Sequence, residues 1–391
     1  MINNYKIIND PVHGFINIPS GLIQEIIEHP YFQRLRDIRQ LGMTNLVYPG
    51  ATHSRLIHAL GAMHLMKEAI ITLRGKGIYI DSAEEEASLC AMLLHDIGHG
   101  PFSHALENNI LTGISHEEIS LSMMKSINIE KNGALKMTIE IFEDRYYKHF
   151  LHQLVSSQLD VDRLDYLKRD SFFSGVAEGM IGLERIIKML NVHENSLVVE
   201  EKGIYSVEKF LISRRLMYWQ VYLHKTVIAA EQLLIQILRR AKVLIMEGIS
   251  LPGSPVISYF MRNTFSEKDL ENKELLDKFA LLDDTDFMSA IKQWQFVDDS
   301  ILSMLCKNLT TRRLPKIVLS SEPIGAGNNY KNDYFTQTGE VLNSGYDIKG
   351  EYIGILSKDG EVRNIYDISD MLSAKAFSQV TKKYFICTAK L

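Results

Sequence analysis

Apolar side chains recur at intervals of three and four residues through most of this 391-residue chain, which is the spacing of amphipathic helices. The first run covers 22–41 and is interrupted at Pro30, whose ring cannot donate a helical hydrogen bond. A second run, 56–73, follows Ser54, a good N-cap residue. The same spacing predicts further helices over 116–127, 135–143, 148–170, 182–190, 207–246 and 266–294.

Another apolar run begins at Asp81 or Ser82 and ends at the sequence Gly-His-Gly-Pro, residues 98–101. Acidic residues fill its first turn, as expected at a helix N-terminus. Because glycine and proline stop helices, the histidines beside this stop are predicted to lie at a helix end.

Strand patterns are confined to the two ends of the chain. Turn residues and β-branched residues in 1–20 predict an extended or hairpin opening, and 350–368 and 382–389 predict three short strands. We therefore expect a mainly α fold, a helical bundle with a small α+β C-terminal part. The expected units are 1–50, a hairpin and helix that pack on the core; 51–250, the helical core; and 251–391, a helical and α+β region with an interface or regulatory role.

Composition narrows the class of protein. A formal net charge of -5 gives no basic field for long polyanions, so nucleic acid is an improbable partner and phosphorylated ligands must be met by local clusters. The three cysteines are widely spaced, which argues against a disulfide framework or a thiolate zinc site. We expect a soluble, cytoplasmic protein without a membrane span, because no signal-like N-terminus or long uninterrupted apolar run is present.

The stretch LLHDIGHGPFSH, residues 93–104, follows an apolar run and contains three histidines and one aspartate: His95, Asp96, His99 and His104. Charged groups at the end of an apolar helix are costly unless they are paired or bound to a metal. Imidazole and carboxylate ligands together suit divalent metals. A helix-end histidine with solvated neighbours is the alternative.

Two more clusters favour the metal hypothesis. Arg55 and His58 share one face of the second predicted helix. In DVDRLDYLKRD, residues 160–170, Asp162, Tyr166 and either Arg169 or Asp170 recur at helical spacing, as a ligand-binding stripe would, although a solvated charged face explains much of the same pattern.

His116 and Glu117 form a further His-carboxylate pair, able to position a water molecule or orient a general acid. An ordinary helix N-terminus behind a serine cap explains this pair equally simply, and we favour that interpretation of the pair taken alone.

Six ordered motifs carry a family resemblance: NDPVHGFI, FQRLRDIRQLG, YPGATHSRLIHALG, HDIGHGPFSH, SHEE and DVDRLDYLKRD. Over roughly residues 5–240 the chain resembles the HD-domain metal-dependent phosphohydrolases. Within them it resembles the deoxynucleoside triphosphate (dNTP) triphosphohydrolases, a family that includes a mammalian restriction factor with an added SAM domain. The final third resembles the family only faintly.

The resemblance implies hydrolysis of a dNTP at the α-phosphorus, with release of deoxynucleoside and intact triphosphate. It implies a divalent metal, of which Mn, Mg, Fe, Ni and Zn are not distinguished, on His58, His95, Asp96 and Asp162. The implied catalytic residues are His99, His104, His116, Glu117 and Glu107, where relatives commonly carry Asp. The implied substrate-binding residues are Gln40, Leu41, Arg55, Arg163, Tyr166, Asp170, Arg214, Tyr222 and His224. The apolar residues beside these last positions, Leu216, Trp219 and Leu223, are predicted to face the core.

The family also implies assembly and regulation. Some relatives bind activating nucleotides between subunits and assemble into tetramers, so we expect a homo-oligomer, either dimer or tetramer. A GTP or dNTP activator is expected at positions matching the family's site: Glu28, Gln33, Arg36, Arg312 and Lys316. A solvated helix face is the alternative explanation of the sequence RLR, residues 34–36.

Three rival hypotheses stay open on the sequence. The first is an HD phosphohydrolase of other specificity, a nucleotidase, phosphodiesterase or alarmone hydrolase. The second is a nucleotide sensor with little turnover, and the third is a purely structural helical protein. Arg163, Tyr166, Asp170 and Arg214 favour a triphosphate substrate, because a monophosphate needs no extended cationic clamp.

Overall fold

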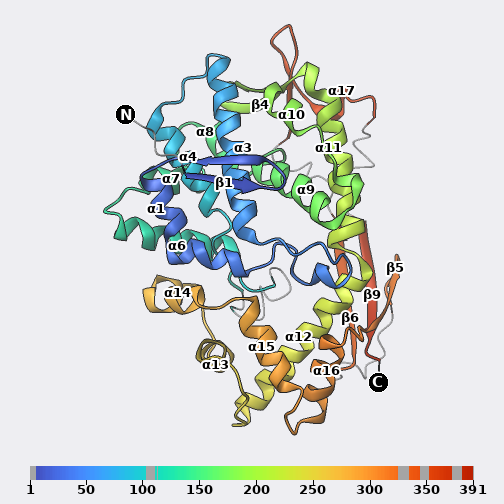
Figure 1. Ribbon diagram of the computed structural model, residues 1–391. Helices are drawn as coiled ribbons and strands as arrows, with labels where there is room; N and C mark the ends of the chain where they lie inside the picture. The colour runs from blue at the N-terminus through green and yellow to red at the C-terminus, as the bar shows by residue number, and fades with distance from the viewer. Residues whose placement is uncertain are drawn as a thin grey trace.

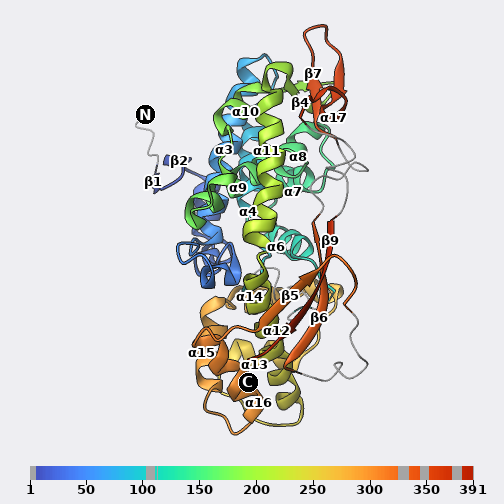
Figure 2. The same ribbon diagram turned by 90° about the vertical axis from the view of Figure 1, so that its right-hand side faces the viewer.

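The computed structural model describes residues 6–102, 111, 113–324, 334–343, 352–371 and 381–390, and helices dominate them. Figures 1 and 2 show an upper body, a lower body and the helix α12 that leads from one to the other. The upper helices are α1 (Leu22–Glu28), α2 (Pro30–Gln33), η1 (Arg34–Asp37), η2 (Gly42–Leu46), α3 (Arg55–Gly75), α4 (Ser82–Leu94), α6 (His116–Glu130), α7 (Lys136–Phe142), α8 (His149–Val155), α9 (Val161–Ser174), η4 (Ala177–Gly179), α10 (Leu183–Met189), η5 (Glu201–Gly203), α11 (Ile204–Met217), the π-helix η6 (Tyr218–Tyr222) and α17 (Ile365–Ile368).

The lower body consists of helices and one sheet. Its helices are α12 (Lys225–Met246), α13 (Pro255–Arg262), η7 (Glu267–Glu271), α14 (Lys273–Ala280), α15 (Asp284–Trp294) and α16 (Ser300–Thr310). Its sheet has the order β5 (Lys316–Ser320), β9 (Thr381–Thr388) and β6 (Thr336–Asn343), all antiparallel. This sheet packs on α12, where Ile228 and Ala229 meet Phe385 and Cys387.

Two smaller sheets belong to the upper body. The hairpin of β1 (Lys6–Asp10) and β2 (Gly14–Ile18) confirms the predicted opening. The second sheet has the order β3 (Leu190–His193), β4 (Ser196–Glu200), β7 (Gly354–Leu356) and β8 (Val362–Asn364), with β4 and β7 parallel.

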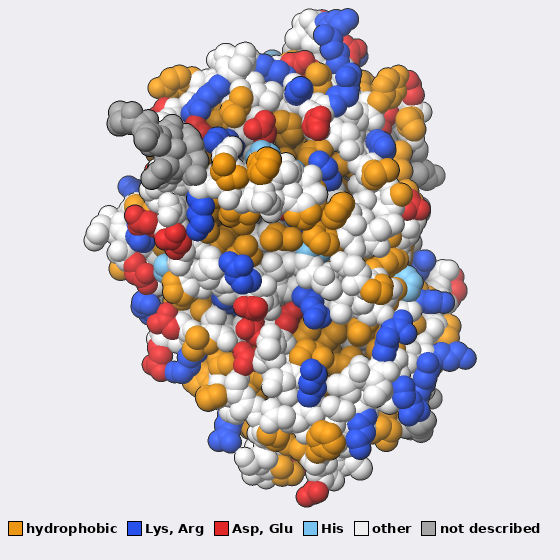
Figure 3. All heavy atoms as spheres, viewed as in Figure 1, with side chains coloured by type: hydrophobic (Ala, Val, Ile, Leu, Met, Phe, Trp, Pro, Cys, Tyr) orange, Lys and Arg blue, Asp and Glu red, His pale blue; other side chains and the backbone are white. Residues whose placement is uncertain are grey.

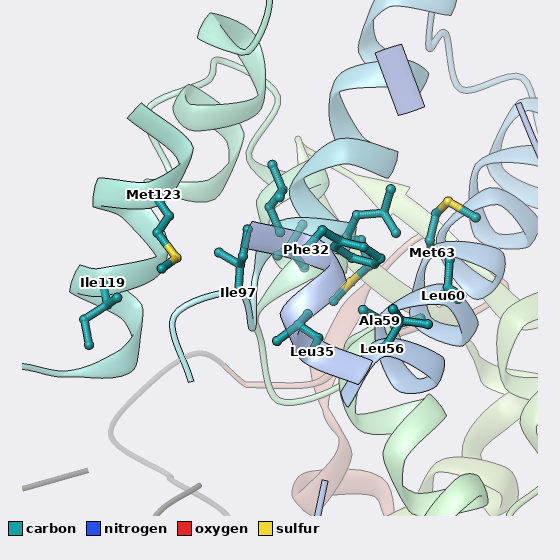
Figure 4. Packing of buried hydrophobic residues seen from close by; sticks show 14 of the residues in the cluster. Phe32, Leu35, Leu56, Ala59, Leu60, Met63, Ile97, Ile119 and Met123 are labelled. Carbon is teal, nitrogen blue, oxygen red and sulfur yellow. The ribbon is translucent and has the colours of Figure 1, made fainter. Parts of the chain in front are cut away.

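The main core surrounds α3, which is apolar on nearly every side and is buried along most of its length. Figure 4 shows Phe32 and Leu35 beside Leu56 and Ala59 of α3, with Ile119 of α6 at the far side of the cluster. By length and composition α3 alone resembles a membrane span among the described helices, but 67% of its most apolar window is buried inside the protein. It is the core helix of a globular fold.

Surface charges are mixed on the face in Figure 3. Acidic and basic side chains alternate over α6 and α14, where Lys273 pairs with Glu130 at 3.2 Å. Lys and Arg side chains gather at the lower right, over the β5-β9-β6 sheet. These Lys and Arg side chains form a local basic patch on a protein whose overall net charge is -5.

The structure confirms the mainly α fold with small C-terminal sheets, but several predicted helices are broken. The run 148–170 splits into α8 and α9, because Asp160 accepts hydrogen bonds from the backbone of Ser157 at 2.8 Å and of Arg163 at 2.7 Å, capping a new helix. The run 207–246 breaks at Leu223–His224, and 266–294 divides into η7, α14 and α15. Helices α13 and α16 and the β3–β4 hairpin were not predicted.

The C-terminal strands also differ from the expected single α+β piece. Residues 354–364 return to the upper body, where β7 pairs with β4, whereas β5, β6 and β9 lie on α12. The C-terminal strands thus form two separate groups, one in the upper body beside β4 and one on α12. The expected division at 250 remains a prediction.

Candidate active site

Three helix ends meet below the core and bring together the predicted metal ligands. His58 comes from the first turns of α3, His95 follows the last residue of α4, and Asp162 lies in the first turn of α9. Asp162 Oδ1 lies 3.0 Å from His58 Nε2 and 3.4 Å from His95 Nε2. One ligand atom from each of the three lies within 4.8 Å of the others, a grouping suited to a metal ion.

The two imidazoles are oriented for coordination. His58 donates from Nδ1 to Asp165 Oδ2 at 2.8 Å, and His95 donates from Nδ1 to the carbonyl of Met92 at 2.7 Å. Each Nε2 is therefore left as the lone-pair atom, and neither buried Nε2 makes a well-aligned hydrogen bond among the described residues. This donor set fits a divalent metal.

Asp165 is itself anchored by a buried network. Arg169 donates to both of its oxygens, at 2.8 and 2.9 Å, and His13 from the β1–β2 hairpin lies 2.6 Å from Oδ1. Arg169 also donates to Asp10 at 2.8 Å. Arg169 thus supports the metal site from behind rather than lining it, which resolves the choice between Arg169 and Asp170 left open by the sequence.

Asp96 stands between two groups of ligands. Its Oδ1 lies 3.3 Å from His95 Nε2 and 3.3 Å from His99 Nε2, and its Oδ2 accepts a hydrogen bond from Arg55. Asp96, His99 and His116 form a second group suited to a cation, and the His99 and His116 rings stack at 3.8 Å. Asp96 therefore belongs to the second group and adjoins the first through His95.

Electrostatics keeps Asp96 ionised and His99 neutral. Burial raises the pKa of Asp96, but the neighbouring His95, His99 and Arg55 outweigh it and hold the pKa well below its usual value. Burial and the charge of Arg55 lower the pKa of His99 well below its usual value. The site therefore offers carboxylate charge to a cation and a neutral imidazole beside it.

A cavity of about 660 Å³ opens from these ligands. Most residues predicted for the site line it: Gln40, Leu41, Arg55, His95, Asp96, His99, His116, Glu117, Asp162, Arg163, Tyr166, Asp170, Arg214 and Tyr222. His58 is fully buried behind it. The structure thus gathers residues from the segments before η2 and after α4 and from α3, α6, α9, α11 and η6 around one cavity, although their roles remain predictions.

His116 and Glu117 satisfy both interpretations of their motif. Ser115 and Glu118 form the capping box that starts α6, while His116 and Glu117 line the cavity. They are the first two residues of the helix, and the His116 ring stacks on that of His99.

Basic side chains cluster in the cavity wall. Arg163 pairs with Asp160, and Arg214, which is buried, donates to Gln158 at 3.4 Å. The Arg214 Nε atom has no hydrogen-bond partner among the described residues. Because an unpaired buried donor is costly, it favours an anionic ligand at this position.

A second polar group holds Asp170 in the cavity. His53 Nε2 donates to its Oδ1 at 2.8 Å, and the Tyr222 hydroxyl donates to its Oδ2 at 2.8 Å. Tyr166 meets the Tyr222 ring edge-on, with centroids 6.1 Å apart. Tyr222 ends the π-helix η6, a rare conformation that is frequent at functional sites.

Some predicted residues lie elsewhere. His104 and Glu107 fall outside the described residues. His224 does not line the cavity and instead caps α12, where its Nδ1 accepts from the backbone of Thr226 at 3.2 Å. Among the activator residues, Gln33 accepts from Arg36 at 3.0 Å, Glu28 accepts from Gln24 at 2.9 Å, and Arg312 donates to the carbonyl of Leu46 at 2.7 Å. Lys316 is exposed at the start of β5.

Sequence reasoning missed part of the cavity wall: Phe142, His152, Val155, Ser156, Tyr218, Leu223 and Glu231. The prediction of a core-facing stripe holds for Leu223 only in part, because it packs against the buried cluster of Ile228 and Phe385 and also lines the cavity, and it was wrong for Leu216, which is 38% exposed. Trp219 is only half-buried and carries Lys383 over its ring at 4.0 Å. The π-helix explains these errors, because it breaks the 3.6-residue period on which the prediction relied.

Comparisons with known proteins agree with this geometry. An HD domain model matches residues 55–170, and a model of the HD associated region matches 181–248. The Bacillus subtilis protein YwfO is 35% identical over 322 residues, which are 80% of this chain and 72% of YwfO. A crystal structure of a phosphohydrolase from Bacteroides thetaiotaomicron superposes with a TM-score of 0.95 at 49% identity and covers 99% of this chain and all of that one. This chain belongs to the HD-domain phosphohydrolase family.

More distant HD-domain relatives carry a specific name. Human deoxynucleoside triphosphate triphosphohydrolase SAMHD1 is 30% identical over 271 residues, which are 57% of this chain and 42% of the human protein. The match spans less than half of that relative, so its activity is not transferred by similarity alone. Within this HD-domain protein, the HD match contains all four predicted metal ligands, and the associated region contains Arg214, Tyr222 and Glu231.

Proposed function

We propose that this HD-domain phosphohydrolase hydrolyses dNTPs to deoxynucleoside and inorganic triphosphate. The observation that carries the proposal is the single cavity that joins a metal-ligand group, three arginines and the held carboxylate of Asp170. A nucleoside monophosphate would use the metal group and Asp170 but needs no extended cationic clamp. A nucleoside triphosphate uses all three, with its phosphates at the arginines and its sugar hydroxyl at Asp170.

A divalent metal held by His58, His95 and Asp162, with Asp96 adjoining, would polarise a phosphoryl oxygen and lower the pKa of a bound water. Arg163 and Arg214 bind the triphosphate charge, and Arg55 fixes the Asp96 carboxylate. The stacked rings of His99 and His116 lie beside Asp96, where they can accept and donate a proton. Glu117 follows His116 and lines the same cavity. By the family resemblance, His104 is proposed as the general acid for the departing 5′ oxygen and Glu107 as the carboxylate that orients it; both lie outside the described residues.

The sugar is recognised by Asp170, two turns after the metal ligand Asp162 on α9. Asp170 accepts its two protein hydrogen bonds one on each oxygen, which leaves lone pairs for the 3′-hydroxyl. Gln40 and Leu41 pack against the deoxyribose, where a 2′-hydroxyl would be crowded. The proposal includes a homo-oligomer and an activating nucleotide at Glu28, Gln33, Arg36, Arg312 and Lys316, and a cytoplasmic location.

The test is product analysis. Purified protein is incubated with Mn²⁺ or Mg²⁺ and each dNTP, alone and mixed with GTP, and the products are separated by anion exchange. Deoxynucleoside with intact triphosphate is the expected result, absent in the Asp162→Ala variant. Turnover only in mixtures supports the activator. Deoxynucleoside monophosphate with pyrophosphate, or no product in any mixture, overturns the proposal in favour of another HD-family specificity.

A further inference from the structure

Glu231 is a carboxyl group in the cavity wall that the proposed chemistry does not use. It lies two turns into α12, partly exposed where the cavity opens. It makes no hydrogen bond or ion pair with any residue in the described part of the chain. An acidic side chain facing a ligand cavity without a partner is suited to accept hydrogen bonds from that ligand.

The cavity has two chemically different ends. Arg163 and Arg214 line the cavity together with Tyr166, and Arg163 pairs with Asp160 while Arg214 donates to Gln158. Neither arginine forms an ion pair or hydrogen bond with Glu231 in the described structure, and burial raises the pKa of Glu231 to about 7. Glu231 therefore lies outside the contacts of the cationic side chains, where the phosphates bind.

This separation orients a bound nucleotide. A triphosphate is attracted to the metal group and the arginines and repelled by a carboxylate. With the phosphates at the metal group and the arginines and the sugar at Asp170, the base is the part of the nucleotide that remains. The base is therefore the part that reaches Glu231. Leu223, on the π-helix side of the same wall, supplies an apolar surface for the base face.

Base chemistry then selects the occupant. Guanine presents N1–H and N2–H side by side, which matches the two acceptor oxygens of a carboxylate. Adenine and cytosine each present one donor next to one acceptor, and thymine presents a single donor between two carbonyls. Resting on the proposed function, we propose that Glu231 determines base specificity by accepting both hydrogen bonds from the Watson–Crick edge of guanine.

The variant Glu231→Gln tests this directly, because its amide keeps the shape but replaces one acceptor by a donor, the pattern that suits adenine. We expect dGTP affinity to fall about 10- to 100-fold, since a site built for a hydrogen-bonding group rejects a mismatched one strongly. We expect dATP affinity to hold or rise. Glu247→Gln removes the same charge from the exposed end of α12 and should change neither.

Binding and turnover are measured separately. Affinities for the four dNTPs are determined by calorimetry with Ca²⁺, and hydrolysis is followed with Mn²⁺. If the order of affinities is the same in wild type and Glu231→Gln, the inference is wrong, whatever the turnover. If the order shifts from guanine to adenine but no triphosphate is released, base recognition by Glu231 stands and the proposed reaction fails.

Discussion

His58 and Asp165 share a buried hydrogen bond, Nδ1 to Oδ2 at 2.8 Å, that holds the imidazole with its Nε2 toward His95 and Asp162. Both side chains are fully buried. The bond therefore selects the tautomer and the ring angle before any metal arrives, as outer partners of metal-binding histidines do.

Replacing Asp165 by Asn should weaken metal binding. One amide oxygen cannot serve His58, His13 and Arg169 together, so the His58 ring loses its fixed orientation. We expect Mn²⁺ affinity to fall about 10- to 100-fold, measured by calorimetric titration. Asp10→Asn is the matched control, because Asp10 bonds Arg169 without contacting His58. Wild-type Mn²⁺ affinity in Asp165→Asn would show that the bond does not position the ligand.

Replacing Arg214 by Ala should weaken triphosphate binding while sparing the metal. Arg214 lines the cavity with an unpaired Nε, and it contacts no predicted metal ligand in the described structure. Loss of a charge-assisted hydrogen bond predicts an increase in KM for dNTPs of about 10-fold or more. Steady-state kinetics and metal analysis are compared with Arg215→Ala, whose side chain does not line the cavity. Equal KM values in the Arg214 variant and wild type would remove Arg214 from the phosphate site.

Replacing Tyr222 by Phe should affect substrates that carry a 3′-hydroxyl most. The Tyr222 hydroxyl holds Asp170 Oδ2 at 2.8 Å, and without it the carboxylate is held by His53 alone. We expect KM for dNTPs to rise about 3- to 10-fold and KM for 2′,3′-dideoxy analogues to change little. A parallel rise for both substrate sets would mean that Asp170 does not meet the 3′-hydroxyl.

The sequence predicted the elements whose apolar face meets one large core. The α3, α4 and α6 helices were expected with nearly their observed starts, because apolar residues recur at helical spacing along each and capping boxes begin α4 and α6, although Ser54 makes no side-chain cap bond at the start of α3. The breaks at 156–160 and 223–224 were missed. They depend on Asp160 capping a new helix and on a π-helix beside the cavity, and neither changes the hydrophobic pattern enough to show.

The same distinction applies to the site. Residues in dense polar motifs, such as His95 and Asp162, were identified because a buried charge needs a partner. Glu231 and His152 stand alone in amphipathic helices, where a single polar residue is typical of a solvated face. Only the packing of α8 and α12 around the cavity shows that they line it.

Asp284 ties two segments next to the cavity to α15, and this predicts a pH-dependent stability. Its Oδ1 accepts from the Phe102 backbone at 2.8 Å and its Oδ2 from the Arg39 backbone at 3.0 Å. Burial raises the pKa of Asp284 to about 6, although both backbone bonds act to lower it. The folded state therefore keeps this proton to a higher pH than the unfolded chain, whose Asp pKa is about 3.9.

The sign follows from proton linkage. Between about pH 4 and pH 6 the unfolded chain releases the Asp284 proton first, so this group contributes stability below pH 4 and loses it as pH rises. The Asp284→Asn variant cannot titrate there and lacks one of the two acceptors. In metal-free urea unfolding it should be less stable than wild type at pH 4, with the gap shrinking by up to about 3 kcal/mol by pH 7. A gap that stays constant across this range would mean that Asp284 is ionised throughout, held by its backbone donors despite its burial.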